Sequence, residues 1–482
     1  MSTVSPNHTV AGYSALARLR VKIENRTARL AIIGLGYVGL PVACAFASAG
    51  FEVLGVEQNQ ERVSLINQGI SPIGGNEPGL ADLVSTVTPA KLRATSDYNE
   101  INGSNGIRPC DVVLIAVETP VEDSDVKGVK VPRYDALRAA LHSLGASLRF
   151  YKSSRASNHN TGVLVIIEST LAPGTMNQLV EPLLVETSGL APEQDFYLAH
   201  CPERVMPGKL LQNLRSINRV VGGMTPEIAE TAAALYRHIV EAELDITDCT
   251  TAELVKTVEN AYRDVQIAFA NEVALICEAA GSDVWQVRSL VNKSPYRQMH
   301  LPGAGVGGHC IPKDPWLLAY SVRENSIISN HEVPLHVIPA ARLVNDGMPR
   351  HMVELTRSGL AEAGIEISAA KVLVMGCAYL ENSDDIRNSP SIELVKYLQE
   401  SGADYLVHDP FVYPYRGELI EMARGCDAVI VMVRHQPYLQ LDLHTLKAIL
   451  HHPVLIDGRH VFDGTVLRSD GWIYRGIGQS FD

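Results

Sequence analysis

Residues 29–57 read RLAIIGLGYVGLPVACAFASAGFEVLGVE, and this stretch decides the fold of the first part of the chain. Arg29–Ile33 and Glu52–Val56 are apolar runs typical of buried strands. Between them, Gly34, Gly36 and Gly39 form GxGxxG at the start of a helix, and Glu57 follows the second strand 21 residues after Gly36. Strand, glycine turn, helix, strand and acid in this order predict a dinucleotide-binding Rossmann domain.

The same stretch indicates the cofactor. The three glycines let a pyrophosphate reach the helix N-terminus, where free amides and the helix dipole favour an anion. Glu57 would accept hydrogen bonds from the adenosine ribose hydroxyls and would repel a 2′-phosphate, so we predict NAD rather than NADP. Leu30–Phe51 is uncharged for 22 residues, which is long enough to cross a bilayer. The glycine motif and Pro41 within it favour a buried strand, turn and helix, so we predict no membrane span.

Two further apolar strands, predicted over Asp111–Val117 and Val163–Ile167, continue a parallel sheet. The residues that follow them include Thr119 after the first strand, and Glu168 and Thr170 after the second. Ligands of doubly wound sheets bind beyond the carboxyl ends of the strands. We therefore expect these three side chains near the cofactor.

Leu301–Asp314 reads LPGAGVGGHCIPKD and places Cys310 behind a run of small residues. Such residues let the backbone approach something bulky. The pattern predicts an exposed, catalytic thiol, and the alternative is a small buried core cysteine. Beside an NAD domain, a thiol suggests that an aldehyde is oxidised through a thiohemiacetal and a thioester, which water then hydrolyses.

A long helix is predicted from Thr250 to Gly281, with Thr250 and Glu253 as a possible capping box. Its apolar positions lie nearly all round the helix. An element of this length and character must be covered, so we predict that it is buried and forms a subunit interface.

Lys256, Asn260 and Arg263 fall on one face of this helix. The lysine and the asparagine could stabilise the oxyanion of each tetrahedral species, and Glu168 could activate the hydrolytic water. A solvated polar stripe is the alternative interpretation.

The last part of the chain returns to alternating strands and helices. Strands are predicted over Lys371–Met375, Tyr405–His408, Ala428–Val433 and Val454–Ile456. This second α/β domain has no GxGxxG, so it should bind something other than a second dinucleotide.

Composition limits the class of protein. The chain has 482 residues, 46% hydrophobic and 20% charged, which predicts about three globular domains. The net charge of -13 argues against nucleic acid and anionic membrane as partners. The eight cysteines form no CxxC pair, which fits a reducing cytoplasm and neither disulfides nor a metal site. Residues 1–25 lack the apolar core of a signal peptide and are interpreted as a polar extension.

Several motifs occur in order over residues 30–390: GLGYVGLP, ESTLAPGT, ELVKTVENAYRDVQIAFANE, GVGGHCIPKDPW and DDIRNSP, with DGRHVFD beyond them. Together they resemble the UDP-glucose/GDP-mannose dehydrogenase family. The resemblance implies NAD-dependent oxidation of the C6 alcohol of a nucleotide sugar to a carboxylate, with two NAD per sugar. His309 and the segment CPERVMPG resemble the UDP-N-acetyl-D-mannosamine dehydrogenases of that family. UDP-N-acetylglucosamine and UDP-glucose remain alternative substrates.

The resemblance also implies a fold and an assembly. The fold is α/β, with an N-terminal Rossmann domain, a central long-helix dimerisation region and a C-terminal Rossmann-like domain. We expect an extension at 1–25, an NAD-binding domain at 26–235, a central dimerisation and catalytic region at 236–345, and a nucleotide-sugar domain at 346–482. The expected assembly is a homodimer or a higher homo-oligomer.

Roles for single residues follow from the resemblance as well. Cys310 would be the nucleophile, Lys256 the proton carrier and oxyanion partner, and Asn260 its companion, while Asp314 and Glu168 would manage the water. The implied NAD contacts are Tyr37, Val38, Glu57, Arg62, Thr119, Thr170 and Arg387. The implied contacts to the sugar nucleotide are Arg204, Val205, Lys256, Asn260, Arg263, Gly307 and Arg459.

Two positions depart from the family pattern. The Phe-Lys expected after the first C-terminal strand is Tyr379-Leu380, and the segment SPYRQ leaves Tyr296 and Arg297 as substitutes for the family's basic contacts. A non-catalytic NAD-binding assembly subunit is therefore an alternative, although the intact Cys310 argues against it. A two-electron reductase would need no cysteine.

Overall fold

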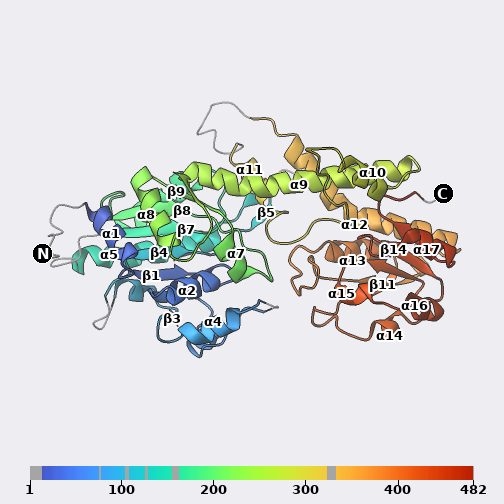
Figure 1. The fold of residues 1–482 in the computed structure, drawn as a ribbon, viewed down its shortest axis with the longest axis horizontal. Helices are drawn as coiled ribbons and strands as arrows, with labels where there is room; N and C mark the ends of the chain where they lie inside the picture. The colour runs from blue at the N-terminus through green and yellow to red at the C-terminus, as the bar shows by residue number, and fades with distance from the viewer. Residues whose placement is uncertain are drawn as a thin grey trace, which may run out of the picture. The chain divides into compact units, whose positions relative to one another are not determined.

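The computed structural model describes residues 14–74, 77–103, 108–124, 129–154, 162–322 and 333–480. They form two compact units, each built around its own β-sheet (Figure 1). The first unit holds the described residues of 1–257 together with 320–322, and the second holds those of 258–319 and 333–480.

The first unit contains an eight-stranded sheet in the order β10-β9-β8-β7-β4-β1-β2-β3. Its strands are parallel except where β8 meets β9, so β9 and β10 run opposite to the others. Read from the other edge, the strands β3-β2-β1-β4-β7-β8 follow the order 3-2-1-4-5-6 that is typical of dinucleotide-binding folds. The strands are β1 (Arg29–Ile33), β2 (Glu52–Val56), β3 (Leu92–Thr95), β4 (Val112–Ile115), β7 (Val163–Ile167), β8 (Phe196–His200), β9 (Arg219–Gly223) and β10 (Leu244–Asp248).

Helices cover both faces of this sheet, which is why β1, β4 and β7 are buried at every residue. The strands predicted over Arg29–Ile33, Glu52–Val56 and Val163–Ile167 are confirmed at both ends. A small hairpin, β5 (Val121–Asp123) with β6 (Lys130–Pro132), follows β4. The helices are α1 (Ala15–Glu24), α2 (Gly39–Ser48), α3 (Gln60–Asn67), α4 (Leu80–Val87), α5 (Asp135–Ser154), α6 (Glu181–Ser188), α7 (Leu210–Ser216) and α8 (Pro226–Tyr236).

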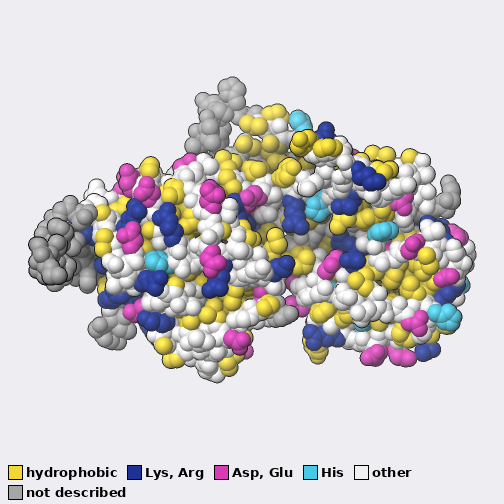
Figure 2. Space-filling view, viewed as in Figure 1, with side chains coloured by type: hydrophobic (Ala, Val, Ile, Leu, Met, Phe, Trp, Pro, Cys, Tyr) yellow, Lys and Arg dark blue, Asp and Glu magenta, His cyan; other side chains and the backbone are white. Residues whose placement is uncertain are grey.

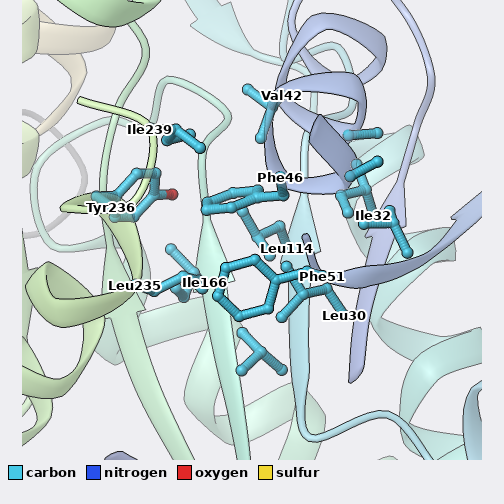
Figure 3. Packing of buried hydrophobic residues seen from close by; sticks show 14 of the residues in the cluster. Leu30, Ile32, Val42, Phe46, Phe51, Leu114, Ile166, Leu235, Tyr236 and Ile239 are labelled. Atoms are coloured by element: carbon cyan, nitrogen blue, oxygen red, sulfur yellow. The ribbon is translucent and has the colours of Figure 1, made fainter. Parts of the chain in front are cut away.

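An aromatic group anchors α2 behind the glycine turn (Figure 3). Phe46 of α2 meets Phe51 edge-on at 5.8 Å between ring centroids, and Tyr236 of α8 lies 5.9 Å from Phe46. All three side chains are fully buried, and each contributes on the order of 1.5–3 kcal/mol. The core therefore holds α2 against the sheet.

The prediction of a polar extension over residues 1–25 is wrong for its second part. Residues 15–24 form α1, whose Leu19 and Ile23 are fully buried in the core of the first unit. Lys22 Nζ lies 2.6 Å from Asp111 Oδ1, beside β4. These two apolar residues lie on one helical face, which is enough to bury one side of an otherwise charged helix. Residues 1–13 lie outside the described residues.

The predicted long helix is confirmed as α9 (Cys249–Ala279). Its predicted capping box is wrong, because the helix begins one residue earlier. The Asp248 carboxylate accepts from the Thr251 amide at 2.9 Å. Glu253 instead accepts hydrogen bonds from the amides of Gly174 at 2.6 Å and Met176 at 2.8 Å, and so ties α9 to the loop after β7.

The second unit contains a five-stranded parallel sheet in the order β12-β11-β13-β14-β15. This is the 2-1-3-4-5 order, whose switch point lies between β11 and β13. The strands are β11 (Lys371–Met375), β12 (Asp404–His408), β13 (Ala428–Val431), β14 (Val454–Asp457) and β15 (Ile473–Gly476).

Alternate residues of these strands face two separate cores, as a pleated sheet requires. Val372 and Val374 of β11 pack with α12 and α13, whereas Leu373 and Met375 pack with α14, α15, α16 and α17. The helices of the unit are α10 (Val284–Val291), α11 (Asp314–Tyr320), α12 (Val337–Glu362), α13 (Pro390–Glu400), α14 (Leu419–Ala423), α15 (Gln436–Leu439), α16 (Leu443–Ile449) and α17 (Gly464–Ser469).

Basic and acidic side chains are interspersed over the face drawn in Figure 2, without a continuous field of one sign. Within the described ranges, none of the helices combines the length and the apolar character that crossing a bilayer requires. Leu30–Phe51 forms β1, the glycine turn and α2, as predicted.

Candidate active site

The three glycines of the turn after β1 have different tasks. A Cβ on Gly34 would lie 2.6 Å from Ala116 O, and one on Gly39 would lie 1.8 Å from Gly34 O. Gly34 also has a φ of +87°. A Cβ on Gly36, in contrast, would meet nothing within 4 Å. Two glycines thus allow close packing, and the third leaves space beside the start of α2 for an anion such as the pyrophosphate of NAD.

Glu57 lies directly after β2, beside this turn. Its carboxylate accepts from the amides of Leu35 at 3.1 Å and Asn59 at 3.0 Å. Arg62 donates to Leu35 O at 2.8 Å, and its Nε lies 4.0 Å from the Glu57 carboxylate. These contacts hold the acid beside the glycine turn, and its contact with the adenosine ribose stays a prediction. Nearby, Tyr37 donates to Gly74 O at 3.2 Å and Val38 immediately precedes α2.

The ends of β4 and β7 are tied together by side chains. Thr119 Oγ1 donates to Thr170 O at 2.7 Å, and Ser169 Oγ donates to Val117 O at 2.6 Å. These threonines lie together beyond the carboxyl ends of neighbouring strands, as predicted. Their contact with NAD stays a prediction.

Glu168 lies in a buried polar cluster at the same edge of the sheet. Its Oε1 accepts from the Tyr236 hydroxyl at 2.5 Å and lies 3.6 Å from Arg219 Nη1. Arg219 also pairs with Glu203. Burial raises the pKa of Glu168 to about 7, Arg219 opposes the rise and Glu203 adds to it. A carboxyl with this pKa can give and take a proton near neutral pH.

His200 ends β8 next to this cluster. It is fully buried, and its Nδ1 lies 2.9 Å from Ile167 O. Its Nε2 is buried without a hydrogen-bond partner among the described residues. Burial and the ammonium of Lys256 lower the pKa of His200 to about 4, so the imidazole is neutral at pH 7. Lys256 is itself buried, with 8% of its surface exposed.

Cys310 is exposed, whereas the other seven cysteines of the chain are buried. Its carbonyl accepts from the amides of Lys313 at 3.1 Å and Asp314 at 2.9 Å, so Cys310 lies in the turn that leads into α11. The prediction of an exposed thiol is confirmed, and its catalytic role stays a prediction.

Asn260 and Asp314 meet in the second unit, where Asn260 Nδ2 donates to Asp314 Oδ2 at 2.5 Å. Lys313 Nζ lies 2.8 Å from Asp314 Oδ1. Asp314 is fully buried, and both of its oxygens face these two partners. Asp314 therefore fixes the orientation of Asn260, one helical turn after Lys256 on α9.

The small residues before Cys310 lie against two bulky side chains, as their composition predicts. A Cβ on Gly303 would lie 2.3 Å from Arg459 Nη1, and one on Gly307 would lie 2.6 Å from Tyr379 Cβ. Arg459 donates to Gly305 O at 3.1 Å. Burial lowers the pKa of Arg459 to about 10.

The remaining predicted contacts are dispersed over both units. Arg387 pairs with Asp385, with Nε 2.9 Å from Oδ1. Arg204 donates to Asn218 O at 2.6 Å. Val205 is half-buried and Arg263 is exposed.

The predicted site residues divide between the two units as follows. The first unit holds Gly34, Gly36, Tyr37, Val38, Gly39, Glu57, Arg62, Thr119, Glu168, Thr170, Arg204, Val205 and Lys256, and the second holds Asn260, Arg263, Gly307, Cys310, Asp314, Arg387 and Arg459.

Three domains of one family match the chain in order. The NAD binding domain of the UDP-glucose/GDP-mannose dehydrogenase family matches residues 28–240, its central domain 250–347 and its UDP binding domain 373–464. The chain belongs to this family. It is thus an NAD-dependent nucleotide-sugar dehydrogenase, and its UDP binding domain implies a UDP-sugar substrate.

Relatives of this dehydrogenase align over nearly the whole chain. UDP-N-acetyl-D-mannosamine dehydrogenase of Pyrococcus horikoshii is 35% identical over 94% of this chain and 99% of its own length. Its solved structure has a TM-score of 0.83 and covers 94% of this chain and 100% of that one. NDP-N-acetyl-D-galactosaminuronic acid dehydrogenase of Ralstonia nicotianae is 35% identical over 91% of this chain and 97% of its own length.

Sequence reasoning missed some of the polar residues that surround the predicted site residues. Arg219, Tyr236 and Glu203 surround Glu168, and Lys313 pairs with Asp314. An arginine opening the apolar strand RVVGG is the one local signal that could have drawn attention to the buried cluster. In the part of the chain described, no three His, Cys, Asp or Glu side chains gather as a metal site would require.

Proposed function

We propose that this dehydrogenase oxidises the C6 alcohol of UDP-N-acetyl-D-mannosamine to the carboxylate, in a four-electron reaction that passes through a thioester on Cys310. The observation that carries the proposal is the single exposed thiol, set in a glycine-rich segment beside α11. A thiol is required only when oxidation continues past the aldehyde.

The open space at Gly36 and the placement of Glu57 fit NAD, which when bound accepts one hydride in each of the two oxidation steps. The Cys310 sulfur adds to the C6 aldehyde, and the carbonyl oxygen becomes an oxyanion. Lys256, in its neutral amine form, takes the proton of the alcohol at the start and becomes an ammonium. That ammonium and the amide of Asn260 stabilise the oxyanion, and Lys256 later returns the proton to solvent. Loss of hydride from the thiohemiacetal leaves the thioester.

Hydrolysis of the thioester needs a base for water. Glu168 is suited to this role because burial raises its pKa to about 7, which makes its carboxylate a stronger base than that of an ordinary glutamate. Water adds to the thioester carbon, the carbon–sulfur bond breaks, and the thiol and the uronic acid are released. Asp314 supports the same step by holding Asn260.

Two NADH per sugar is the decisive stoichiometry. We expect Cys310→Ala to abolish complete turnover, and Cys249→Ala, which changes a buried cysteine, to retain it. The measurement is NADH formed per mole of sugar consumed, with the product analysed by mass. One NADH per sugar and free aldehyde as the final product would contradict the proposal.

The choice of sugar rests on the CPERVMPG segment and on the names of the relatives. Other relatives at similar identity are named NDP-N-acetyl-D-galactosaminuronic acid dehydrogenase. We expect kcat/KM to be highest for UDP-N-acetylmannosamine, then UDP-N-acetylglucosamine, then UDP-glucose, with steps of ~10–200-fold between epimers. UDP-N-acetylgalactosamine belongs in the same panel. A higher kcat/KM for it than for UDP-N-acetylmannosamine would show that the proposed substrate is wrong. Leu380→Lys should strengthen binding without changing the order.

We also propose that the active unit is at least a dimer joined along α9. In the second unit Val258, Tyr262, Phe269 and Ile276 form an exposed stripe on this helix, and Tyr262 is 64% exposed. Their spacing of four, seven and seven residues keeps them on one face. Phe269→Glu should yield monomers in sedimentation, and Ile70→Glu, an exposed apolar position of the first unit, should not. A fully active wild-type monomer would refute the proposal.

A further inference from the structure

The segment before Cys310 is held by the loop that follows β11 in the same unit. The Gly308 amide donates to Arg387 O at 2.9 Å. The Gly308 carbonyl accepts from Asn388 Nδ2 at 3.0 Å. Arg387 and Asn388 therefore bind the amide and the carbonyl of Gly308, which lies two positions before Cys310.

Packing leaves this segment little room to shift. A Cβ on Gly308 would lie 2.7 Å from the Tyr379 ring, and one on Gly307 would lie 2.8 Å from Asn388 O. Gly308 has a φ of +93°, a conformation that glycine adopts without strain. The backbone itself is thus pressed against the loop after β11.

Asn388 combines two properties that few residues share. Its φ is +48°, in the left-handed region, which asparagine tolerates better than most side chains. Its carboxamide also donates to a carbonyl. An aspartate would tolerate the same backbone, but its carboxylate has no hydrogen to donate and would face the Gly308 carbonyl with like polarity.

Beyond the thiol, the chain is held independently. Cys310 O accepts the amides of Lys313 and Asp314 at the start of α11, and Asp314 is bound to Asn260. The thiol therefore stands between two attachments, one to α11 and α9 and the other to Arg387 and Asn388.

We propose that Asn388 is a positioning residue for the Cys310 thiol, through which the loop at residues 376–389 sets where the nucleophile stands. That loop lies within the matched UDP binding domain, so the domain that recognises the nucleotide also places the sulfur. The catalytic consequence rests on the proposed function. A displacement of about 1 Å in a reacting group can cost on the order of 100-fold in rate.

Two variants and one matched control test the proposal. Asn388→Asp keeps the shape and removes the donor, and Asn388→Gly keeps the left-handed backbone without a side chain. Asn382→Asp is the control, because Asn382 lies in the same loop with a φ of +55°. Its side chain accepts a hydrogen bond, from Gln436 N at 2.8 Å, which an aspartate also does.

The first readout needs no substrate. Amide hydrogen exchange in peptides spanning 303–312 should rise by about tenfold or more in both Asn388 variants and stay unchanged in the control. The second is steady-state kinetics: kcat should fall roughly 10–100-fold, whereas the KM for the UDP-sugar should change by less than about threefold. Melting temperatures of all variants should lie close to the wild type.

Unchanged exchange in Asn388→Asp, or an equal rise in Asn382→Asp, would overturn the proposal. Raised exchange with an unchanged kcat would also overturn it, because the contact would then be structural only. If the wild type oxidised none of the UDP-sugars, the proposed function would fail, and the exchange result would decide the attachment by itself.

Discussion

The two sheets of this dehydrogenase differ in the loops at their switch points, in the space beside the loop backbone and in what binds its amides. After β1, the turn leaves space at Gly36 beside the start of α2. After β11, the amides of Cys377 and Ala378 are already bound by the Asp409 carboxylate, at 2.7 and 2.9 Å. The first loop leaves open space beside the backbone at Gly36, whereas in the second loop two consecutive amides are bound by one buried carboxylate.

The acidic residues that follow the strands also differ between the two sheets, in their exposure and in what they bind. Glu57 after β2 binds two amides and stays 15% exposed, so it can still reach a ribose. Asp409 after β12 is fully buried and also bound to His435. Asp457, at the end of β14, likewise accepts amide hydrogen bonds, from Arg459, Val461 and Phe462.

Glycine substitutions should show the largest effect and sharpen the comparison. Gly36→Val should weaken NAD binding by ~100-fold or more, because its side chain fills the pyrophosphate space, yet leave the melting temperature near that of the wild type. Gly39→Val should instead prevent folding of the first unit, since its Cβ would meet Gly34 O at 1.8 Å. NAD titration by calorimetry and thermal unfolding measure both. Normal NAD affinity in Gly36→Val would contradict backbone recognition.

Asp409→Asn should destabilise the second sheet, by about 3 kcal/mol at pH 7, since buried amides lose an acceptor. Burial alone would raise the pKa of Asp409, but hydrogen bonds from His435 and from Ala378 N lower it to about 2. Because the folded pKa lies below the ordinary 3.8, this stabilisation is present above that value and is lost as pH falls towards about 2.

Denaturant unfolding at pH 7, 4 and 2.5 tests the Asp409 prediction. The difference in unfolding free energy between wild type and variant should shrink by roughly 1.5 kcal/mol between pH 7 and pH 2.5, and most of that change should occur below pH 4. A gap that is independent of pH would show that the carboxylate's charge plays no part.

Glu57→Gln should produce a smaller effect, confined to the first sheet. We expect the ratio of kcat/KM for NADP to that for NAD to rise about tenfold, which corresponds to about 1.4 kcal/mol. Glutamine keeps the shape and one acceptor for the Leu35 or Asn59 amide, so folding should be little affected. A wild type that uses both cofactors equally would break the assignment of Glu57 to the ribose.

Tyr236→Phe should produce the smallest shift. The Tyr236 hydroxyl donates to Glu168 and favours its charged form, so its loss should raise the pKa of Glu168 above about 7. As the base must be deprotonated, kcat rises with pH through that pKa, and the rise in the variant should move up by roughly half a unit to one unit. The contribution of Glu168 to the free energy of unfolding should change in the opposite direction to kcat. It should fall as pH rises from about 4.5 to 7, because the folded state holds the Glu168 proton more tightly than the unfolded state. Identical acidic limbs would exclude Glu168 as the base.

Much of the fold could be predicted because its signals are local. The strands Arg29–Ile33, Val163–Ile167 and Lys371–Met375 have the predicted bounds, since continuous apolar runs are what two-sided burial selects. The strand at Arg219–Gly223 was not predicted, because it is short and ends in two glycines. Residues 15–24 were misassigned because two buried residues are a weak signal in a charged segment.

The site was predicted less evenly. Cys310 and Gly36 stand in motifs whose small residues reveal close backbone approach, so their setting could be anticipated. The sequence predicts Glu253 as a partner in a helix cap, but it binds the amides of Gly174 and Met176. A glutamate near a helix start looks the same in sequence whether it caps its own helix or a distant loop.

By itself, the sequence determined the NAD turn, the two α/β domains, the long helix and the exposed thiol. Each is a repeating or small-residue pattern within about 30 residues, and such patterns report the local environment of the backbone. Only the tertiary structure decided that Tyr236 faces Glu168 across 68 residues, and that Asn388 holds Gly308 across 80. These residues meet only because distant helices, strands and loops pack together. The residue type at one position does not indicate which distant residue will contact it.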